Sequence, residues 1–310
     1  MASLTLIEQA KGMQGREVEQ AVVEVFATST PILEVLPFRE IGGNSYTYSR
    51  EQRLPGVAFR GVNESFTPTR GVVNPITETL TIVGGEIEVD NFTLHTEGED
   101  VRAREEAMQI KSIAEEWQRA FFKGDSSTNP REMDGLQRRI TGNQLIPAGA
   151  TAGGDALSLV TLDTAISRVM NPTHLLMNKK MRIRLQAAAR DVNVGGYITF
   201  GPNEFGRRIM RYHEIPILEV EDAAGEDTVL PFSETNPGGG TPASTSIYVL
   251  SIGPNMVEGI QNGGMQVRDI GEMENKPAVK TRLEWYSGLT VKHGRSAARL
   301  HGIKDVAVVA

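Results

Sequence analysis

The segment from Pro55 to Pro75 constrains the fold of this chain more than any other part of the sequence. It contains three prolines and three glycines, and a structureless insertion of this length is uncommon in a compact domain and is usually functional. Either its apolar side chains fold back on the parent lobe or they are buried against another copy of the chain, and we favour the second. These side chains have no regular scaffold on which to form a core of their own: Val57, Phe59, Val62, Phe66, Val72 and Val73.

Strand patterns flank this segment on both sides. Residues 45–54 alternate tyrosine with small polar side chains, and residues 76–94 alternate apolar side chains with threonine, which predicts two strands. Gly84 and Gly85 break the second run, and the apolar phase changes near Asp90, which predicts a bulge there.

A long helix from about Glu97 to Lys123 is the clearest element in the sequence. Lys123 and Gly124 end it in the usual order of a cation followed by glycine. At 1.5 Å per residue the helix is about 40 Å long, which makes it a strut longer than a small core can cover. Its buried stripe follows the spacing of a helix: Ile110, Ala114, Trp117 and Phe121.

The N-terminal residues 3–36 have a helical but broken pattern. We interpret them as short helices on an extended arm, with Pro31 opening a second helix that runs through Leu36. The alternative is an ordinary N-terminal helix that docks on the chain's own core. One apolar stripe supports the helical pattern: Val18, Ala21, Val22, Val25 and Phe26.

From about residue 131 the pattern becomes mixed α/β. A short helix ends before Pro172, and Asn178 can cap a helix over 179–190. Asn262-Gly263-Gly264 looks like a hairpin turn. Further strands are predicted at 174–177, 215–220, 246–252, 265–270 and 278–292.

Composition excludes several classes of protein. Apolar residues make up 39% of 310 residues, so a folded protein of two lobes, or of one domain with large extensions, is expected. No apolar run approaches the ~18–20 residues that a membrane crossing requires. The net charge is −7 and cysteine is absent, so neither a basic nucleic-acid-binding face nor a disulfide or thiolate site is expected. An acidic wall can still enclose DNA without sticking to it.

No group of residues predicts catalysis, a cofactor or a metal site. Gly124-Asp125-Ser126-Ser127 superficially resembles the nucleophile block of GDS-type lipases, but it follows a long helix at the position of a helix stop and turn. The five histidines never pair at i, i+3 or i+4, so ordinary surface or sheet positions are favoured over metal binding.

The order of these elements resembles the major capsid proteins of tailed bacteriophages with the HK97 fold, over nearly the whole chain. Four stretches carry the resemblance: Phe121 to Asp125 leading to Asp134-Gly135-Leu136, Leu175 to Asn178, Phe205-Gly206 through Ile215-Pro216-Ile217, and Arg282 to Leu289 ending in Ala297 to Leu300.

The resemblance implies an α+β fold with four parts. These are an N-terminal arm (1–41), an extended β-hairpin loop (42–86), a peripheral domain with a spine helix (87–130 and 277–310) and an axial α/β domain (131–276). It also implies that hexamers and pentamers close an icosahedral shell around double-stranded DNA, which they do not bind specifically. The expected location is the virion capsid, assembled in the host cytoplasm.

Two departures from the family pattern refine this expectation. Residues 42–86 contain no lysine, so the lysine-to-asparagine crosslink of some members is not expected. We expect ion pairing and burial between subunits instead, through Arg50, Arg53, Phe59, Arg60, Phe66 and Arg70. A recognisable arm also begins close to Met1, so we expect no built-in scaffold; a separate scaffolding protein, or none, would then be used beside portal and decoration proteins.

Three alternatives stay open at this point. The nearest is an encapsulin-type nanocompartment shell, which has the same fold and would need an inner-wall pocket for cargo peptides. A hydrolase-like enzyme would use Ser126 or Ser127 with an ordered histidine and carboxylate. A soluble binding module would be a monodisperse monomer.

Overall fold

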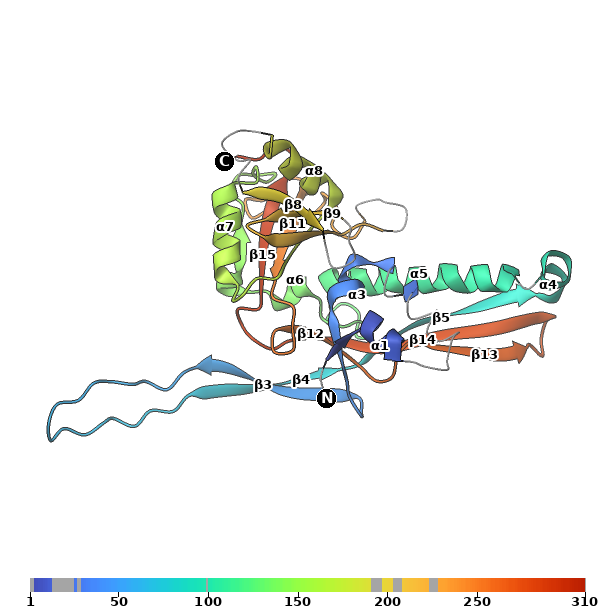
Figure 1. Cartoon of the computed structure of the whole chain (residues 1–310), viewed down its shortest axis with the longest axis horizontal. Coiled ribbons are helices and arrows are strands. Elements are labelled where there is room, and N and C mark those ends of the chain that lie inside the picture. Colours follow the sequence, from blue (N-terminus) through green and yellow to red (C-terminus); the bar gives the residue numbers. More distant parts are fainter. Residues whose placement is uncertain are drawn as a thin grey trace.

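The computed structural model describes residues 3–12, 25–26, 29–98, 100–190, 197–202, 208–222 and 228–309. It has an α+β architecture with two sheets, two clusters of buried apolar side chains and a separate two-stranded hairpin (Figure 1). Among the described residues, no helix is long and apolar enough to cross a membrane.

The first sheet is organised around one long strand, β14 (Ala278–Val291), which confirms the strand predicted at 278–292. β5 (Thr81–Asp90) pairs antiparallel with it over residues 278–287. β12 (Val257–Gln261) and β13 (Gln266–Glu272) also run antiparallel to it, one after the other. β2 (Pro37–Glu40) extends the sheet beside β12, and β1 (Leu4–Thr5) pairs with β2.

The segment Asn262-Gly263-Gly264 is not the hairpin turn that its sequence indicated. A hairpin would pair β12 with β13, but both strands pair with β14. The amide of Asn262 still donates to the carbonyl of Tyr286 in β14, 3.2 Å away. Gly263 has a φ of 72°, so the glycines permit a local break between two strands that follow each other along one partner.

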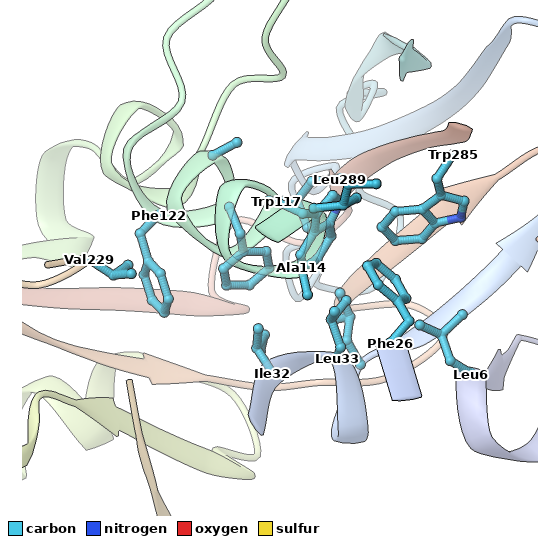
Figure 2. Packing of buried hydrophobic residues seen from close by; sticks show 14 of the residues in the cluster. Leu6, Phe26, Ile32, Leu33, Ala114, Trp117, Phe122, Val229, Trp285 and Leu289 are labelled. Carbon is cyan, nitrogen blue, oxygen red and sulfur yellow. The ribbon is translucent and has the colours of Figure 1, made fainter. Parts of the chain in front are cut away.

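Helix α5 (Asp100–Lys123) packs on this sheet and buries the predicted stripe. Trp117 lies at the centre, where its indole donates to Ser287 Oγ at 3.0 Å. Around Trp285 the rings of Phe26 and Trp117 lie 4.9 and 5.6 Å away between centroids (Figure 2). The ring of Phe38 lies 5.2 Å away. This aromatic cluster joins the helix, the sheet and the N-terminal segment into one core.

The described part of the N-terminal segment docks on the chain's own core. Helices α1 (Leu6–Gly12) and α3 (Pro31–Val35) contribute Leu6, Ile32 and Leu33 to the same cluster as Trp285 (Figure 2). Pro31 does open a helix, with Leu36 as its C-cap. Three residues of the predicted stripe lie outside the described residues: Val18, Ala21 and Val22.

The end of β5 differs from the sequence prediction. The phase change near Asp90 marks a change from strand to helix, not a bulge, because α4 (Asn91–Glu97) begins there. The Asp90 carboxylate caps it by accepting from the Phe92 amide at 2.7 Å. Gly98 then adopts a φ of 89°, so α5 starts at Asp100 instead of Glu97 and the predicted strand over 76–94 ends four residues early.

Gly84 and Gly85 lie inside β5 and do not break it, contrary to the prediction. Because neither glycine has a side chain, neighbouring groups can approach this part of β5 closely on both faces. A Cβ on Gly84 would lie 2.3 Å from the carbonyl oxygen of Leu283, which is backbone, whereas a Cβ on Gly85 would meet the end of the Gln109 side chain.

These two glycines should therefore respond differently to alanine. Gly84→Ala must move a strand, so we expect it to lower the free energy of unfolding by about 1–3 kcal/mol. In Gly85→Ala the Gln109 side chain can rotate away, so we expect a cost below about 1 kcal/mol. Urea unfolding of the two variants measures the difference, and equal costs would contradict the assignment.

The second sheet has the order β6-β15-β11-β7-β10-β9-β8. Its strands include the predicted ones at 174–177, 215–220 and 246–252. Asn178 caps α8 (Lys179–Ala188) as predicted, accepting from the Met181 amide at 2.8 Å, and α7 (Leu159–Arg168) packs near β15. The strands are β6 (Leu145–Pro147), β7 (His174–Met177), β8 (Ile198–Pro202), β9 (Arg208–Tyr212), β10 (Ile215–Glu219), β11 (Ser244–Leu250) and β15 (Ala297–Lys304).

Sheet membership groups the chain differently from the expected ranges. β12, inside the range 131–276, belongs to the first sheet with β14. β15, inside the range 277–310, belongs to the second sheet, where it pairs with β11. The chain therefore passes between the two sheets more often than a division at residue 276 implies.

Candidate functional site

The hairpin of β3 (Ser45–Arg53) and β4 (Val72–Thr79) projects away from both sheets (Figure 1). All side chains from 54 to 71 are exposed. Val57 is 95%, Phe59 107%, Val62 92% and Phe66 62% exposed. The apolar side chains of the tip therefore do not fold back on the parent lobe, and the first of the two alternatives for this segment is wrong.

Local contacts shape the tip of the hairpin. The Gly61 amide donates to Glu64 Oε2 at 2.7 Å, and Arg60 Nη1 donates to the Glu64 carbonyl at 3.0 Å. The Arg60 guanidinium also lies 5.4 Å from the centroid of the Phe66 ring, a cation–π contact. Thr69 Oγ1 donates to the Gly56 carbonyl at 2.8 Å and joins the two sides of the loop.

The four arginines predicted to contact other subunits fall into two groups. Arg53 and Arg70 are exposed and make no hydrogen bond or ion pair among the residues that the structure describes. Arg60 is exposed at the tip, beside Phe66. Arg50 is different, because its guanidinium donates to the Val291 carbonyl of its own chain. Arg50 thus anchors the hairpin to β14.

The base of the hairpin is polar, and on the β3 side one residue, Tyr48, is buried. Its hydroxyl donates to the Val291 carbonyl at 3.1 Å. Burial raises the pKa of Tyr48, and the nearby Glu78 charge adds to the effect. The Tyr46 ring lies 5.6 Å from the Arg39 guanidinium and 5.2 Å from the Lys292 ammonium.

Those two cations share a buried carboxylate in β12. Glu258 is fully buried and pairs with Arg39 Nε at 3.1 Å and with the Lys292 ammonium. A buried carboxylate is stable only with such partners. This group of charges therefore fixes β2, β12 and the end of β14 beside the hairpin.

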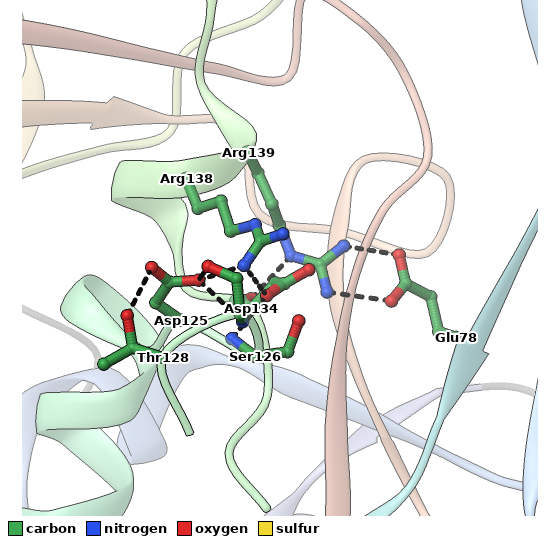
Figure 3. A network of polar contacts seen from close by, with 8 residues as sticks. Glu78, Asp125, Ser126, Thr128, Asp134, Arg138 and Arg139 are labelled. Carbon is green, nitrogen blue, oxygen red and sulfur yellow. Dashed lines mark hydrogen bonds and ion pairs between the residues drawn. The ribbon is translucent and has the colours of Figure 1, made fainter. Parts of the chain in front are cut away.

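On the β4 side a second ion pair, which is largely shielded from solvent, holds the hairpin. The Glu78 carboxylate accepts a hydrogen bond from each Nη atom of Arg139, and the one from Nη2 to Oε2 is 2.8 Å long (Figure 3). Arg139 lies in α6 (Leu136–Arg139), and its Nε donates to the Asp134 carbonyl at 2.6 Å. Burial disfavours the charged guanidinium, but the hydrogen bonds and charge of Glu78 keep the pKa of Arg139 above its usual value.

The sequence predicted a turn after α5, and in the structure the carboxylates of Asp125 and Asp134 build it. Asp125 accepts from the Ser127 amide and hydroxyl at 2.9 and 2.6 Å, and Arg138 pairs with it (Figure 3). Hydrogen bonds from Ser127, with a contribution from Arg138, lower the pKa of Asp125 to about 2. The Ser126 amide donates to Asp134. Both serines thus serve the turn, which does not support a hydrolase-like role.

A cleft of about 550 Å³ lies where the hairpin base meets this turn. Its walls come from β4 and β5, from the turn and from β14, and include Glu78, Ile82, Ser126, Met133 and Arg139. Among the described residues no group of three or more His, Cys, Asp or Glu side chains could hold a metal ion. His174 is a sheet residue whose burial lowers its pKa to about 4.

Sequence reasoning missed the anchor residues of the hairpin: Tyr48, Glu78, Arg139 and Glu258. Tyr48 entered only as part of an alternating strand pattern, and Arg139 was not assigned any contact. Glu78 and Arg139 are 61 positions apart, and neither stands in a local motif. The only sequence signal for this anchor was Glu78 itself, a single carboxylate between two threonines of the predicted strand.

Comparisons with known proteins agree with this architecture. A family model described as Major capsid protein GP7 matches residues 14–164, just under half of the chain. No curated protein matches the chain.

Solved structures match over most of the chain at low identity. The holo-SrpI encapsulin complex from Synechococcus elongatus PCC 7942 is 19% identical over 91% of each chain, with a TM-score of 0.63. The capsid of an empty GTA particle is 15% identical over 89% of this chain and 90% of that one, with a TM-score of 0.62. A chain from Mycobacterium phage Bobi is 13% identical over 90% of each, with a TM-score of 0.61. Identities this low establish the fold alone. These structures show that the chain has the HK97-like fold, and over residues 14–164 it is similar to the Major capsid protein GP7 family.

Proposed function

We propose that the chain assembles as hexamers and pentamers into an icosahedral shell that encloses the double-stranded DNA genome of a tailed phage. The observation that carries this proposal is the projecting hairpin tip with its exposed Phe59 and Phe66. A tip that buries no apolar surface in its own subunit gains stability only by covering that surface on another copy. In a closed shell every subunit has neighbours, so the apolar surface of every tip can be covered.

The parts of the chain take the following roles in this proposal. Residues 1–41 are the N-terminal arm and 42–86 the extended loop that lies over a neighbour. The first sheet with α5 is the peripheral domain, and the second sheet within 131–276, together with β15, is the axial domain that meets its copies at the centre of a capsomer.

The role is structural, without catalysis or a bound cofactor. The acidic chain, with a net charge of −7, encloses DNA without specific binding because its walls repel phosphate. Assembly takes place in the host cytoplasm and the product is the virion capsid. Separate scaffolding, portal and decoration proteins are the expected partners.

Negative-stain imaging of the purified protein tests the proposal. We expect uniform hollow shells with five-fold and six-fold capsomers. A sedimentation experiment on the same sample should place nearly all the protein in one large species. A monodisperse monomer at concentrations where related shells form would overturn the proposal.

The shell should contain no crosslink from the hairpin. The extended loop has arginine at all four of its cationic positions, and arginine stays protonated, so it does not act as an amine nucleophile. Mature particles boiled in detergent should run as a single band at the subunit mass of 33.8 kDa. A ladder of linked subunits, with a linked peptide from residues 42–86 in mass spectrometry, would contradict this.

An encapsulin-type shell is the second candidate, favoured by the 0.63 TM-score to the SrpI encapsulin. The two candidates differ in their contents. Particles purified from the native host and treated with nuclease should retain protected double-stranded DNA under the first proposal. Particles that retain a single co-purifying protein and no DNA would favour the second.

A further inference from the structure

We infer that the Glu78–Arg139 pair sets the direction in which the hairpin projects and couples that direction to the link between the two sheets. This makes the two residues positioning residues for assembly. The inference rests on the proposed function for its consequence in a shell, but its physical content concerns a single subunit.

The pair is well suited to fix an orientation. The side chains of Glu78 and Arg139 are only 16% and 12% exposed, so water cannot replace either partner at low cost. Both Nη atoms of the guanidinium face both oxygens of the carboxylate (Figure 3). A planar, two-point contact of this kind restricts rotation as well as distance.

The two strands of the hairpin are fixed to different elements. β3 is held by Tyr48 and Arg50, and both donate to the Val291 carbonyl at the end of β14. β4 is held by Glu78 to Arg139 in α6. With one anchor alone the hairpin could pivot about that anchor, whereas two anchors on separate strands remove this freedom.

The β4 anchor also connects the hairpin to the passage between the sheets. Arg139 donates through Nε to the Asp134 carbonyl, while the Asp134 carboxylate accepts from the Ser126 amide at 2.9 Å (Figure 3). This segment leads from the end of α5 to α6 and then to β6 of the second sheet. A rotation of the second sheet about this link would therefore move Arg139 and, through it, the hairpin.

Distance measurements between two spin labels test the inference, and the absence of cysteine makes labelling specific. Labels are placed at Leu54→Cys beside the hairpin tip and Val160→Cys on α7, both on exposed side chains. The protein is measured in the form isolated before shell closure, and circular dichroism verifies the fold of each variant. In the unaltered background we expect one narrow distance distribution.

Three variants in this labelled background distinguish orientation from charge. We expect Arg139→Gln to widen the distribution at least about twofold. Arg139→Lys keeps the charge but loses the two-point contact, so this variant should also widen the distance distribution. The matched control is Arg138→Gln, because Arg138 lies on the same helix but pairs with Asp125 and Asp134 and not with the hairpin; we expect a much smaller widening than in Arg139→Gln.

The outcomes separate this inference from the proposed function. An unchanged width in folded Arg139→Lys, or an equal widening in Arg138→Gln, would overturn the inference. If Arg139→Gln does not fold, the lysine variant still decides. A narrow distribution that widens as expected, in a protein that forms no shells, would keep the inference and overturn the proposed function.

Discussion

Replacing both Phe59 and Phe66 by serine is expected to abolish shell formation while leaving the fold of the subunit unchanged. Both rings are exposed in the isolated chain, so their loss removes nothing from its core. If each ring is buried on a neighbour, the lost contact amounts to about 1.5–3 kcal/mol per ring. The loss recurs in every subunit, so at a fixed protein concentration closed shells should give way to free capsomers.

Two measurements check this result. Sedimentation should show the loss of the large species, and thermal unfolding of the isolated subunit should change by no more than a few degrees. Phe92→Ser is the matched control, because Phe92 is also an exposed phenylalanine but lies in α4 and not on the hairpin. Normal shells from the doubly substituted protein would show that the tip is not an assembly contact.

Trp285→Ala should have the largest effect on the stability of the subunit itself. Trp285 is fully buried and in contact with Phe26 and Trp117 (Figure 2) and with Phe38. Removing its ring leaves a cavity, and comparable truncations cost about 3–5 kcal/mol. The indole also donates to Gln261 Oε1 at 3.2 Å, so the variant leaves that buried amide oxygen unpaired.

Denaturant unfolding of the isolated subunit measures this cost. The control is Ile82→Ala in β5, whose side chain is 70% exposed; it should lie within about 0.5 kcal/mol of the unaltered protein. Because Phe26 belongs to the N-terminal segment, Trp285→Ala should also speed amide hydrogen exchange in α1 and α3. A cost below about 1 kcal/mol would contradict the central position of this ring.

Periodicity predicted the elements that have one apolar face. The stripe of α5, the strand at 278–292 and the cap at Asn178 all follow from local rules and are confirmed. β12 had no such signal. All five of its residues are buried, yet they include Glu258, Gly259 and Gln261. Glu258 can be buried because Arg39 and Lys292 pair with its carboxylate, and Gln261 accepts a hydrogen bond from the Trp285 indole. These partners lie far away in the sequence or on another strand.

The candidate site was predictable in part. The exposure of the tip follows from a Pro/Gly-rich segment with apolar side chains and no scaffold, which the sequence displays. Arg50 was assigned to contacts between subunits because it shares the charge of Arg53 and Arg70. Its actual partner is a carbonyl at the end of β14. Only the pairing of distant strands brings that carbonyl beside β3, and one sequence does not encode such pairing in any local pattern.

The long strand β14 also determines when during synthesis the protein can fold. Its partner β5 is complete early, but Asp90 pairs with Ala278, so the ladder waits until almost the whole chain has been made. At about 5–20 residues per second, close to two hundred residues take about 10–40 s to synthesise. Throughout that interval β5 has no sheet to join, and its edge is open to pairing with other nascent chains. The chain thus depends on β14, a strand near its C-terminus, to protect β5, a strand from its first third.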